Sequence, residues 1–238
     1  MTAVLGNLRP VDGNGKLVGG DPAQCARVLG VDGLAVSLLA GEGLAELVWC
    51  SPGPSAQLED LQFTLGLGPG PETAASCAPV LEADLSRVPD ERWPGLLSEA
   101  MALGVGAVFC LPLHIGGACV GTMTLQRTKP GPLSPTGMGD ALILAGALTA
   151  VVLEGGEAQG AFADAESNSV LYRAAVHQAT GMISVQAGVP LAQALLRLRA
   201  YAFRHGQPVV EAAEDVVARR VHFRHDGNEP DSSGSRRG

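Results

Sequence analysis

The 238-residue sequence has few aromatic residues and no long hydrophobic run. Aromatic residues make up 4% of the chain, which argues against a sheet whose exposed Phe and Tyr rows stack RNA bases. The longest apolar run, Ala141 to Leu153, lies between Asp140 and Glu154, and its 13 residues fall short of the about 20 that a transmembrane helix needs. The first residues lack the basic start and apolar stretch of a signal peptide. These absences predict a cytoplasmic protein without a membrane partner.

The sequence also lacks the motifs of common enzymes and metal sites. Its five cysteines are scattered, without a CxxC pair, which predicts reduced thiols that are mostly buried. It contains no P-loop, no HExxH motif and no recognisable Ser/His/Asp set. We therefore expect no enzymatic activity, no cofactor and no metal site.

The charges are distributed unevenly along the chain. Residues 1–166 hold 7 Lys and Arg against 18 Asp and Glu, whereas residues 167–224 hold 7 Arg against 3 acidic residues. The whole chain has a net charge of −8. An acidic body followed by a basic segment suggests two modules, and the basic module could bind an anionic partner or simply present a solvated surface.

Apolar runs in residues 20–154 predict an α+β domain. We expect a helix near 21–30, strands at 34–39 and 44–50, and a loop at 66–72. The clearest pair of strands, 105–113 and 118–125, flanks Gly116-Gly117, a favoured two-residue hairpin turn. A helix at 139–154 is apolar nearly all round, so we expect it to be buried on several sides. This order predicts an antiparallel sheet with flanking helices that cover one face.

The remaining residues predict a small helical bundle and two unstructured ends. Residues 1–19 are rich in glycine and form the predicted flexible N-terminus, residues 155–168 the linker, and residues 225–238 the disordered tail. Between the linker and the tail, residues 169–224 predict three helices, at 169–187, 190–205 and 208–223, separated by Gly188 and Gly206.

Two stretches resemble known domain families. Residues 169–224 are similar to the ANTAR domain, an RNA-binding three-helix module of bacterial transcription antiterminators. The matching residues are Ala179, Gly181, Met182, Ala194, Leu198, Arg199, Ala202 and Ala213. Residues 20–154 resemble a GAF domain, a fold that senses small molecules, in QFTLGLGPGPETAASCAPVLEADL at 62–85, RWPGL at 92–96 and GVGAVFCLPLHIGGACVGTMTL at 104–125. This arrangement resembles actinobacterial antitermination regulators.

The ANTAR resemblance implies an RNA surface, and side chains off the predicted apolar stripes are its candidates. We predict apolar stripes at Ala175/Ala179/Met182 on the first helix and at Ala194/Leu195/Leu198/Ala202 on the second. Spacings of four and three then place three polar residues on one other face of the first helix. The predicted RNA-binding residues are Arg199, Thr180, His177, Arg173, Arg197 and Arg204. Thr180 stands where many ANTAR domains carry Lys.

The GAF resemblance implies a pocket between the sheet and its covering loops. The predicted lining residues are Phe63, Leu85, Trp93 and Phe109, for which plain core packing remains an alternative. The combination predicts a homodimeric RNA-binding antitermination regulator that binds leader-RNA hairpins, under control of a signal or an unknown small-molecule ligand. An alternative is a sensor whose C-terminal bundle mediates dimerisation or protein contacts.

Overall fold

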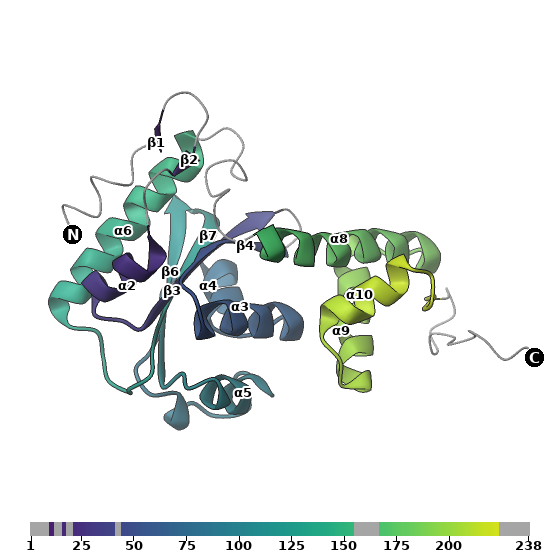
Figure 1. Cartoon of the computed structure of the whole chain (residues 1–238), viewed down its shortest axis with the longest axis horizontal. Coiled ribbons are helices and arrows are strands. Elements are labelled where there is room, and N and C mark those ends of the chain that lie inside the picture. Colours follow the sequence, from purple (N-terminus) through teal and green to yellow (C-terminus); the bar gives the residue numbers. More distant parts are fainter. Residues whose placement is uncertain (1–9, 12–15, 18–20, 41–43, 155–166, 224–238) are drawn as a thin grey trace, which may run out of the picture. The chain divides into compact units, whose positions relative to one another are not determined.

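The computed structural model describes residues 10–11, 16–17, 21–40, 44–154 and 167–223. The chain divides between Ser167 and Asn168 into two compact units (Figure 1). The predicted tail, and the predicted linker up to residue 166, lie outside the described residues. Of the predicted flexible N-terminus, only strands β1 Pro10–Val11 and β2 Lys16–Leu17 are described, and they pair antiparallel.

The N-terminal unit contains an antiparallel five-stranded sheet in the order β4-β3-β7-β6-β5. Its strands are β3 Gly33–Ala40, β4 Leu44–Cys50, β5 Val80–Glu82, β6 Ala107–Ile115 and β7 Ala118–Arg127. The predicted hairpin at Gly116-Gly117 is confirmed, because β6 and β7 pair from Ile115↔Ala118 to Ala107↔Arg127. The long central strands β3, β7 and β6 therefore present two faces, and side chains alternate between them.

One face of the sheet is apolar and is covered by α2 Pro22–Leu29 and α6 Pro135–Glu154. Asp21 caps α2, since its carboxylate accepts a hydrogen bond from the Ala23 amide at 2.9 Å. The core of this face contains alternate residues of the central strands, including Leu34, Val36, Phe109, Leu111, Met123 and Leu125.

Helices also cover the other face, so the prediction of helices on a single face is wrong (Figure 1). They are α3 Pro54–Leu65, α4 Pro69–Ser76, the 3-10 turn Leu85–Arg87 and α5 Leu96–Ala102. Helix α4 begins inside the predicted loop 66–72. Because Pro69 occupies the first helical turn, where its missing N–H costs no hydrogen bond, a Gly-Pro-rich stretch can open a helix here.

Helix α6 is less buried than its composition predicts. Leu144 and Leu148 are fully buried against the sheet, but Leu142, Ile143 and Leu153 are 55%, 53% and 50% exposed. By length and composition, Pro135–Leu153 could cross a membrane, a test that a core helix of a soluble protein also passes. The expectation of burial on several sides is therefore wrong, and one face of α6 carries exposed apolar side chains.

The C-terminal unit consists of α8 Ser167–Ala187, α9 Leu191–His205 and α10 Val209–Val217. Between Ala187 and Leu191 the chain turns by 106°. The core is rich in alanine and valine and comprises Val176, Ala179, Ile183, Ala187, Ala194, Leu195, Leu198, Ala202, Val209, Val210, Ala212, Ala213, Val216, Val221 and Phe223. Helix α10 is shorter than predicted, because the backbone leaves the helix at Arg219, whose φ of 60° lies in the left-handed region.

Candidate functional sites

The sheet face toward α3 and α4 is polar at its centre. Ser37 on β3 and Thr122, Thr124 and Gln126 on β7 are buried there, and we call them the polar layer. Their neighbours in sequence, such as Val36 and Met123, point into the apolar core on the opposite face. The same two strands therefore supply an apolar face and a hydrogen-bonding face.

A carboxylate on α3 lies over the polar layer. Glu59 is buried and accepts hydrogen bonds from Ser37 Oγ at 2.7 Å and from Gln62 Nε2 at 2.9 Å. Gln62 Oε1 in turn accepts from the Gly70 amide at 2.7 Å. At Gly68, φ is +131°, and a Cβ would lie 2.8 Å from Gln62 Oε1, so this position requires glycine. The Gly-Pro stretch of the sequence thus fits α4 against this carboxylate network.

One acceptor of the polar layer is unused. Gln126 donates from Nε2 to Ser55 Oγ at 3.2 Å, but its buried Oε1 has no hydrogen-bond partner among the described residues. A buried unpaired acceptor costs about 1–3 kcal/mol, so this group calls for an explanation, and a bound polar molecule is one. Nearby, burial raises the pKa of the Cys110 thiol to about 12, which keeps the thiol protonated at neutral pH.

The four predicted pocket residues do not line one pocket. Leu85 and Trp93 are buried in the core beside α5. Phe109 instead lies in the apolar core under α2 and α6, on the opposite face of the sheet, because odd-numbered residues of β6 point that way. Phe63 is buried on α3 and belongs to neither apolar core. The inclusion of Phe109 in the predicted pocket is wrong.

Trp93 is fixed by an ion-pair cluster. Its indole Nε1 donates to Glu72 Oε2 at 2.9 Å, and Arg92 pairs with Glu72 at 2.7 Å and also with Glu82. The Arg92 guanidinium stacks over the indole, 4.6 Å from the ring centroid. Hydrogen bonding to Arg92 lowers the pKa of the Glu72 carboxyl. Because its ring is buried and its N–H is used, Trp93 acts as a packing residue in this structure.

In the C-terminal unit, the position of Thr180 corrects one predicted RNA contact. Thr180 is only 2% exposed, and its hydroxyl donates to the Val176 carbonyl at 2.7 Å. The buried stripe of α8 runs through residues 176, 179, 180, 183 and 187, one residue away from the predicted stripe at 175, 179 and 182. Thr180 therefore faces the core, and its prediction as a surface contact is wrong.

The other predicted RNA residues lie in different environments. Arg199, His177 and Arg197 are half-buried, and Arg204 is exposed near the end of α9. Burial lowers the pKa of Arg199 to about 10, so its guanidinium still carries a positive charge at neutral pH. Arg173 lies on α8, but its side chain is outside the described part of the chain. Their role in binding stays a prediction.

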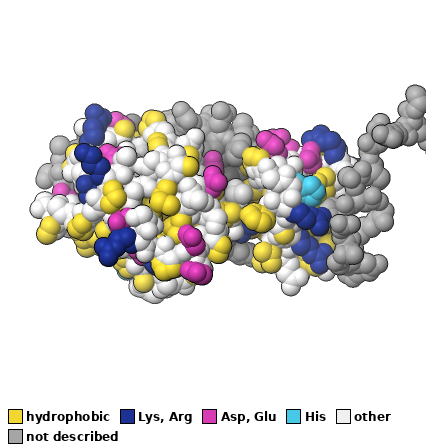
Figure 2. Space-filling model, turned by 90° about the horizontal axis from the view of Figure 1, so that it is seen from below, with side chains coloured by type: hydrophobic (Ala, Val, Ile, Leu, Met, Phe, Trp, Pro, Cys, Tyr) yellow, Lys and Arg dark blue, Asp and Glu magenta, His cyan; other side chains and the backbone are white. Residues whose placement is uncertain are grey.

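The structure also reveals exposed side chains that the sequence reasoning did not select. Leu196 and Phe203 are 66% and 76% exposed and lie seven residues apart on α9, hence on one face of the helix. On the C-terminal unit, Figure 2 shows arginine side chains beside exposed hydrophobic ones. The low aromatic content of the chain does not exclude a single exposed ring, which only the burial pattern identifies.

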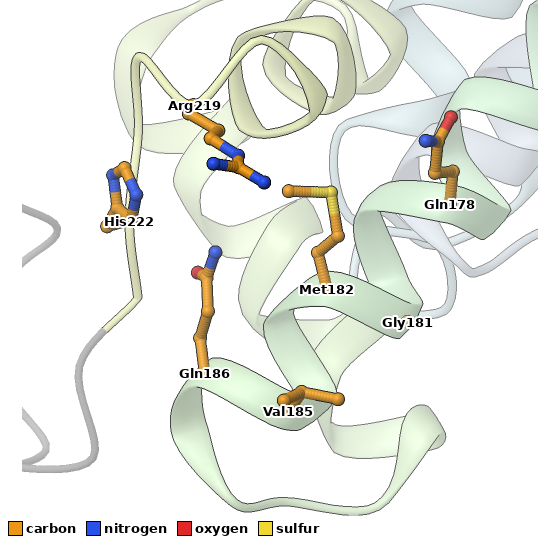
Figure 3. A pocket seen from close by; sticks show the side chains of 7 residues that line it. All are labelled: Gln178, Gly181, Met182, Val185, Gln186, Arg219 and His222. Atoms are coloured by element: carbon orange, nitrogen blue, oxygen red, sulfur yellow. The ribbon is translucent and has the colours of Figure 1, made fainter.

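A groove of about 580 Å³ crosses the C-terminal unit (Figure 3). One wall is a face of α8, and the other is the segment that follows α10. The lining residues are Gln178, Gly181, Met182, Val185, Gln186, Arg219 and His222. Positions 178, 181, 182, 185 and 186 share one helix face by their spacing, which the sequence could have shown. Arg219 and His222 could not be placed, because the sequence predicted a helix there.

Comparisons with known proteins agree with both units. A family model for the GAF domain matches residues 23–145, and one for the ANTAR domain matches residues 168–217. The GAF domain of a phosphoenolpyruvate-protein phosphotransferase from Coxiella burnetii has 14% identity and a TM-score of 0.50, covering 64% of this chain and 90% of that chain. A GAF domain/HD domain protein from Geobacter sulfurreducens has 16% identity and a TM-score of 0.43, covering 55% and 88%. No curated protein matches the chain.

Proposed function

The chain belongs to the GAF domain family and carries an ANTAR domain, a known RNA-binding antitermination module, and from this premise we propose a cytoplasmic, signal-responsive regulator of transcription. The ANTAR unit binds a leader-RNA hairpin that competes with a terminator, and the GAF unit receives the signal. The observation that carries this proposal is the charge reversal: 7 Arg against 3 acids in residues 167–224, after 7 basic and 18 acidic residues in 1–166.

A gel shift with transcripts that contain two-hairpin leaders tests RNA binding. About 3–4 phosphate contacts give a log–log salt slope near −3, so retention should weaken steeply with salt. Arg204→Ala should weaken retention, whereas Arg27→Ala, which removes an exposed arginine of the N-terminal unit, should not. Absence of retention by the folded protein, at low salt, would contradict the proposal. A terminator read-through assay with the same RNA then tests antitermination.

One observation favours the alternative that the C-terminal unit binds protein. Leu196 and Phe203 form an uncovered apolar pair on α9, and such exposed pairs commonly mark protein contacts. Under this alternative, Leu196→Asp should abolish self-association or partner binding, and no RNA should be retained. Under the RNA proposal, salt-sensitive retention persists in Leu196→Asp.

For the GAF unit, we propose that the polar layer is where a small polar molecule binds. Gln126 Oε1 is a buried acceptor that needs a donor, and the Glu59 carboxylate on α3 lies over the same layer. Acceptors of this kind would bind a small molecule with N–H groups. Native mass spectrometry of the purified chain should show a bound compound that Gln126→Leu loses and the exposed control Gln57→Leu retains. The proposed ligand site would be contradicted if the wild-type chain carries no compound and no polar metabolite raises its melting temperature.

We further propose that the protein is a homodimer that pairs through α6. The exposed apolar residues of α6 follow a pattern that is complementary to itself. If two antiparallel copies cross at Gly146, then Leu142 faces Ala150 of a second copy, and Leu153 faces Gly139, so that these two leucines each meet a small residue. Antiparallel helix dipoles also attract each other.

Gly146→Leu tests this pairing without disturbing the single chain, because a Cβ at Gly146 meets nothing within 4 Å. Light scattering should show a wild-type dimer and a Gly146→Leu monomer. Ala102→Leu adds the same side chain at an exposed position of α5 and should leave the dimer intact. A dimer that persists in Gly146→Leu places the interface elsewhere, and a wild-type monomer contradicts the homodimer.

A further inference from the structure

The groove between α8 and the segment after α10 is preformed, because contacts within the chain fix its two walls. The Phe223 amide donates to Gln186 Oε1 at 3.0 Å, and Val221 and Phe223 are buried. The ring of Phe223 also packs edge-on against Tyr201, with ring centroids 5.8 Å apart. These contacts hold the segment after α10 beside α8, so that the groove keeps its shape.

The side chains of the groove offer three kinds of contact. Figure 3 shows Arg219 reaching across the groove toward Met182, with Gln186 below it. Met182 and the 85% exposed Val185 form an apolar surface, and Gly181 beside Met182 contributes no side chain. Gln178 and His222 are exposed at the margins and can donate or accept hydrogen bonds.

Arg219 supplies the charge of the groove. The neighbouring Arg220 pairs with Asp215 at 2.7 Å and so turns away from the groove. Arg219 instead leaves the helix with φ of 60°, an uncommon conformation for a residue other than glycine, and this directs its guanidinium into the groove. Two adjacent arginines thus have different surroundings, one in an ion pair and one in the groove.

We propose that this groove binds an unpaired nucleotide from the loop of an RNA hairpin. The base lies on Met182 and Val185, its edge is read by Gln178, and Arg219 contacts a phosphate, as the chemistry of each group requires. A volume of about 580 Å³ falls within the range of about 300–1,000 Å³ of small-ligand pockets. Only unpaired bases can enter it, because the bases of a helical stem are stacked and paired, whereas those of a loop can be splayed out. This inference rests on the proposed RNA binding and names its contact site.

The proposed test uses the full chain and a stem–loop RNA library with a fixed stem and a randomised loop. Arg219→Ala should lower affinity about tenfold and reduce the salt slope by about 1, whereas Arg220→Ala, which removes the same charge outside the groove, should change affinity less than twofold. Gly181→Leu fills the groove without a clash, since a Cβ at Gly181 meets nothing within 4 Å, and it should lower affinity at least tenfold. Ala192→Leu, at an exposed position of α9, is its control.

Sequencing of the retained RNA tests base reading. Gln178→Leu should change which loop sequences are retained, and Gln193→Leu on α9 should not. A blunt duplex with the stem sequence should not compete. If the groove variants keep wild-type affinity and loop preference, the groove is not the site although RNA binding stands. If the wild-type chain retains no loop from the library, the proposed function fails together with this inference.

Discussion

The two units place their polar side chains in opposite ways. The N-terminal unit buries a carboxylate, two glutamines and several hydroxyls between its sheet and α3 and α4. Among the described residues of the C-terminal unit, the polar side chain that is buried is Thr180, and the arginines lie half-buried or exposed. Buried hydrogen-bonding groups are suited to bind a small polar ligand that is transferred from water into the protein. An apolar interior with arginine side chains on the surface is instead suited to bind a polyanion such as RNA.

The two units also differ in the size of the apolar side chains that fill their cores. Large aliphatic side chains such as Leu111, Met123 and Leu148 fill the apolar face of the sheet. The C-terminal unit packs mainly through alanine and valine, so each of its few larger residues, such as Leu198, carries more of the packing. Because each unit has its own core, we expect each to unfold in its own transition.

The largest expected effect comes from Leu198→Ala, which removes a large side chain from the core of the C-terminal unit. Leu198 is fully buried on α9, and removal of its side chain should cost about 2–5 kcal/mol of unfolding free energy. Calorimetry should show that the transition of the C-terminal unit moves down while that of the N-terminal unit stays. Leu196→Ala, which truncates an exposed leucine on the same helix, is the control. Equal shifts of both transitions would show that the units do not unfold separately.

Glu59→Ala removes the centre of the buried network in the N-terminal unit. Ser37 Oγ and Gln62 Nε2 lose their acceptor, and the cost of such buried unpaired donors is about 2 kcal/mol. Denaturant unfolding should show the loss in the N-terminal unit only. Glu91→Ala, at an exposed position of the same unit, should stay within about 0.5 kcal/mol of wild type. A neutral Glu59→Ala would show that the interior polar groups are solvated in solution, and the contrast between the units would weaken.

Glu72→Gln makes a smaller change at the rim of the N-terminal unit. The Glu72 side chain is 40% exposed, so loss of its charged bonds to Arg92 should cost only about 0.5–1 kcal/mol. Because the pKa of Glu72 is lowered in the folded state, its stabilisation is present above the ordinary glutamate pKa and lost as pH falls through the lowered value. Stability measured from neutral pH to pH 3 should therefore fall less steeply in Glu72→Gln. Identical slopes would contradict a role for this ion pair.

Local signals were sufficient for much of the fold. The hairpin β6–β7 follows from two alternating apolar runs around Gly116-Gly117, and the breaks at Gly188 and Gly206 separate the C-terminal helices. At the start of α4, proline and glycine alternate, and such a sequence is compatible with a loop or with the first turn of a helix. The hydrogen bond from the Gly70 amide to Gln62, which favours the helix, could not be predicted from the sequence. The apolar composition of α6 could not reveal which of its apolar side chains are exposed, since that depends on which elements pack against the helix.

The candidate sites were harder to predict because they depend on which face a side chain occupies. In β6, the alternation that places Phe109 opposite Val108 and Cys110 is regular, and a count along the strand would have removed Phe109 from the pocket. In α8, alanine and glycine blur the contrast between faces, so a stripe displaced by one residue fits the sequence nearly as well. Arg219 needed the structure, because no glycine marks the end of α10.

Thr180→Val should have the smallest effect, and it tests whether the buried hydroxyl of Thr180 matters for stability or RNA binding. The Val176 carbonyl already accepts the backbone bond of the helix, so loss of the Thr180 hydroxyl should change stability by no more than about 0.5 kcal/mol. Because the side chain faces the core, RNA affinity should equal that of wild type, and Arg219→Ala in the same assay should lower it. A marked loss of affinity in Thr180→Val, with unchanged melting temperature, would place residue 180 at the RNA after all and would mean that α8 turns its buried face outward on binding.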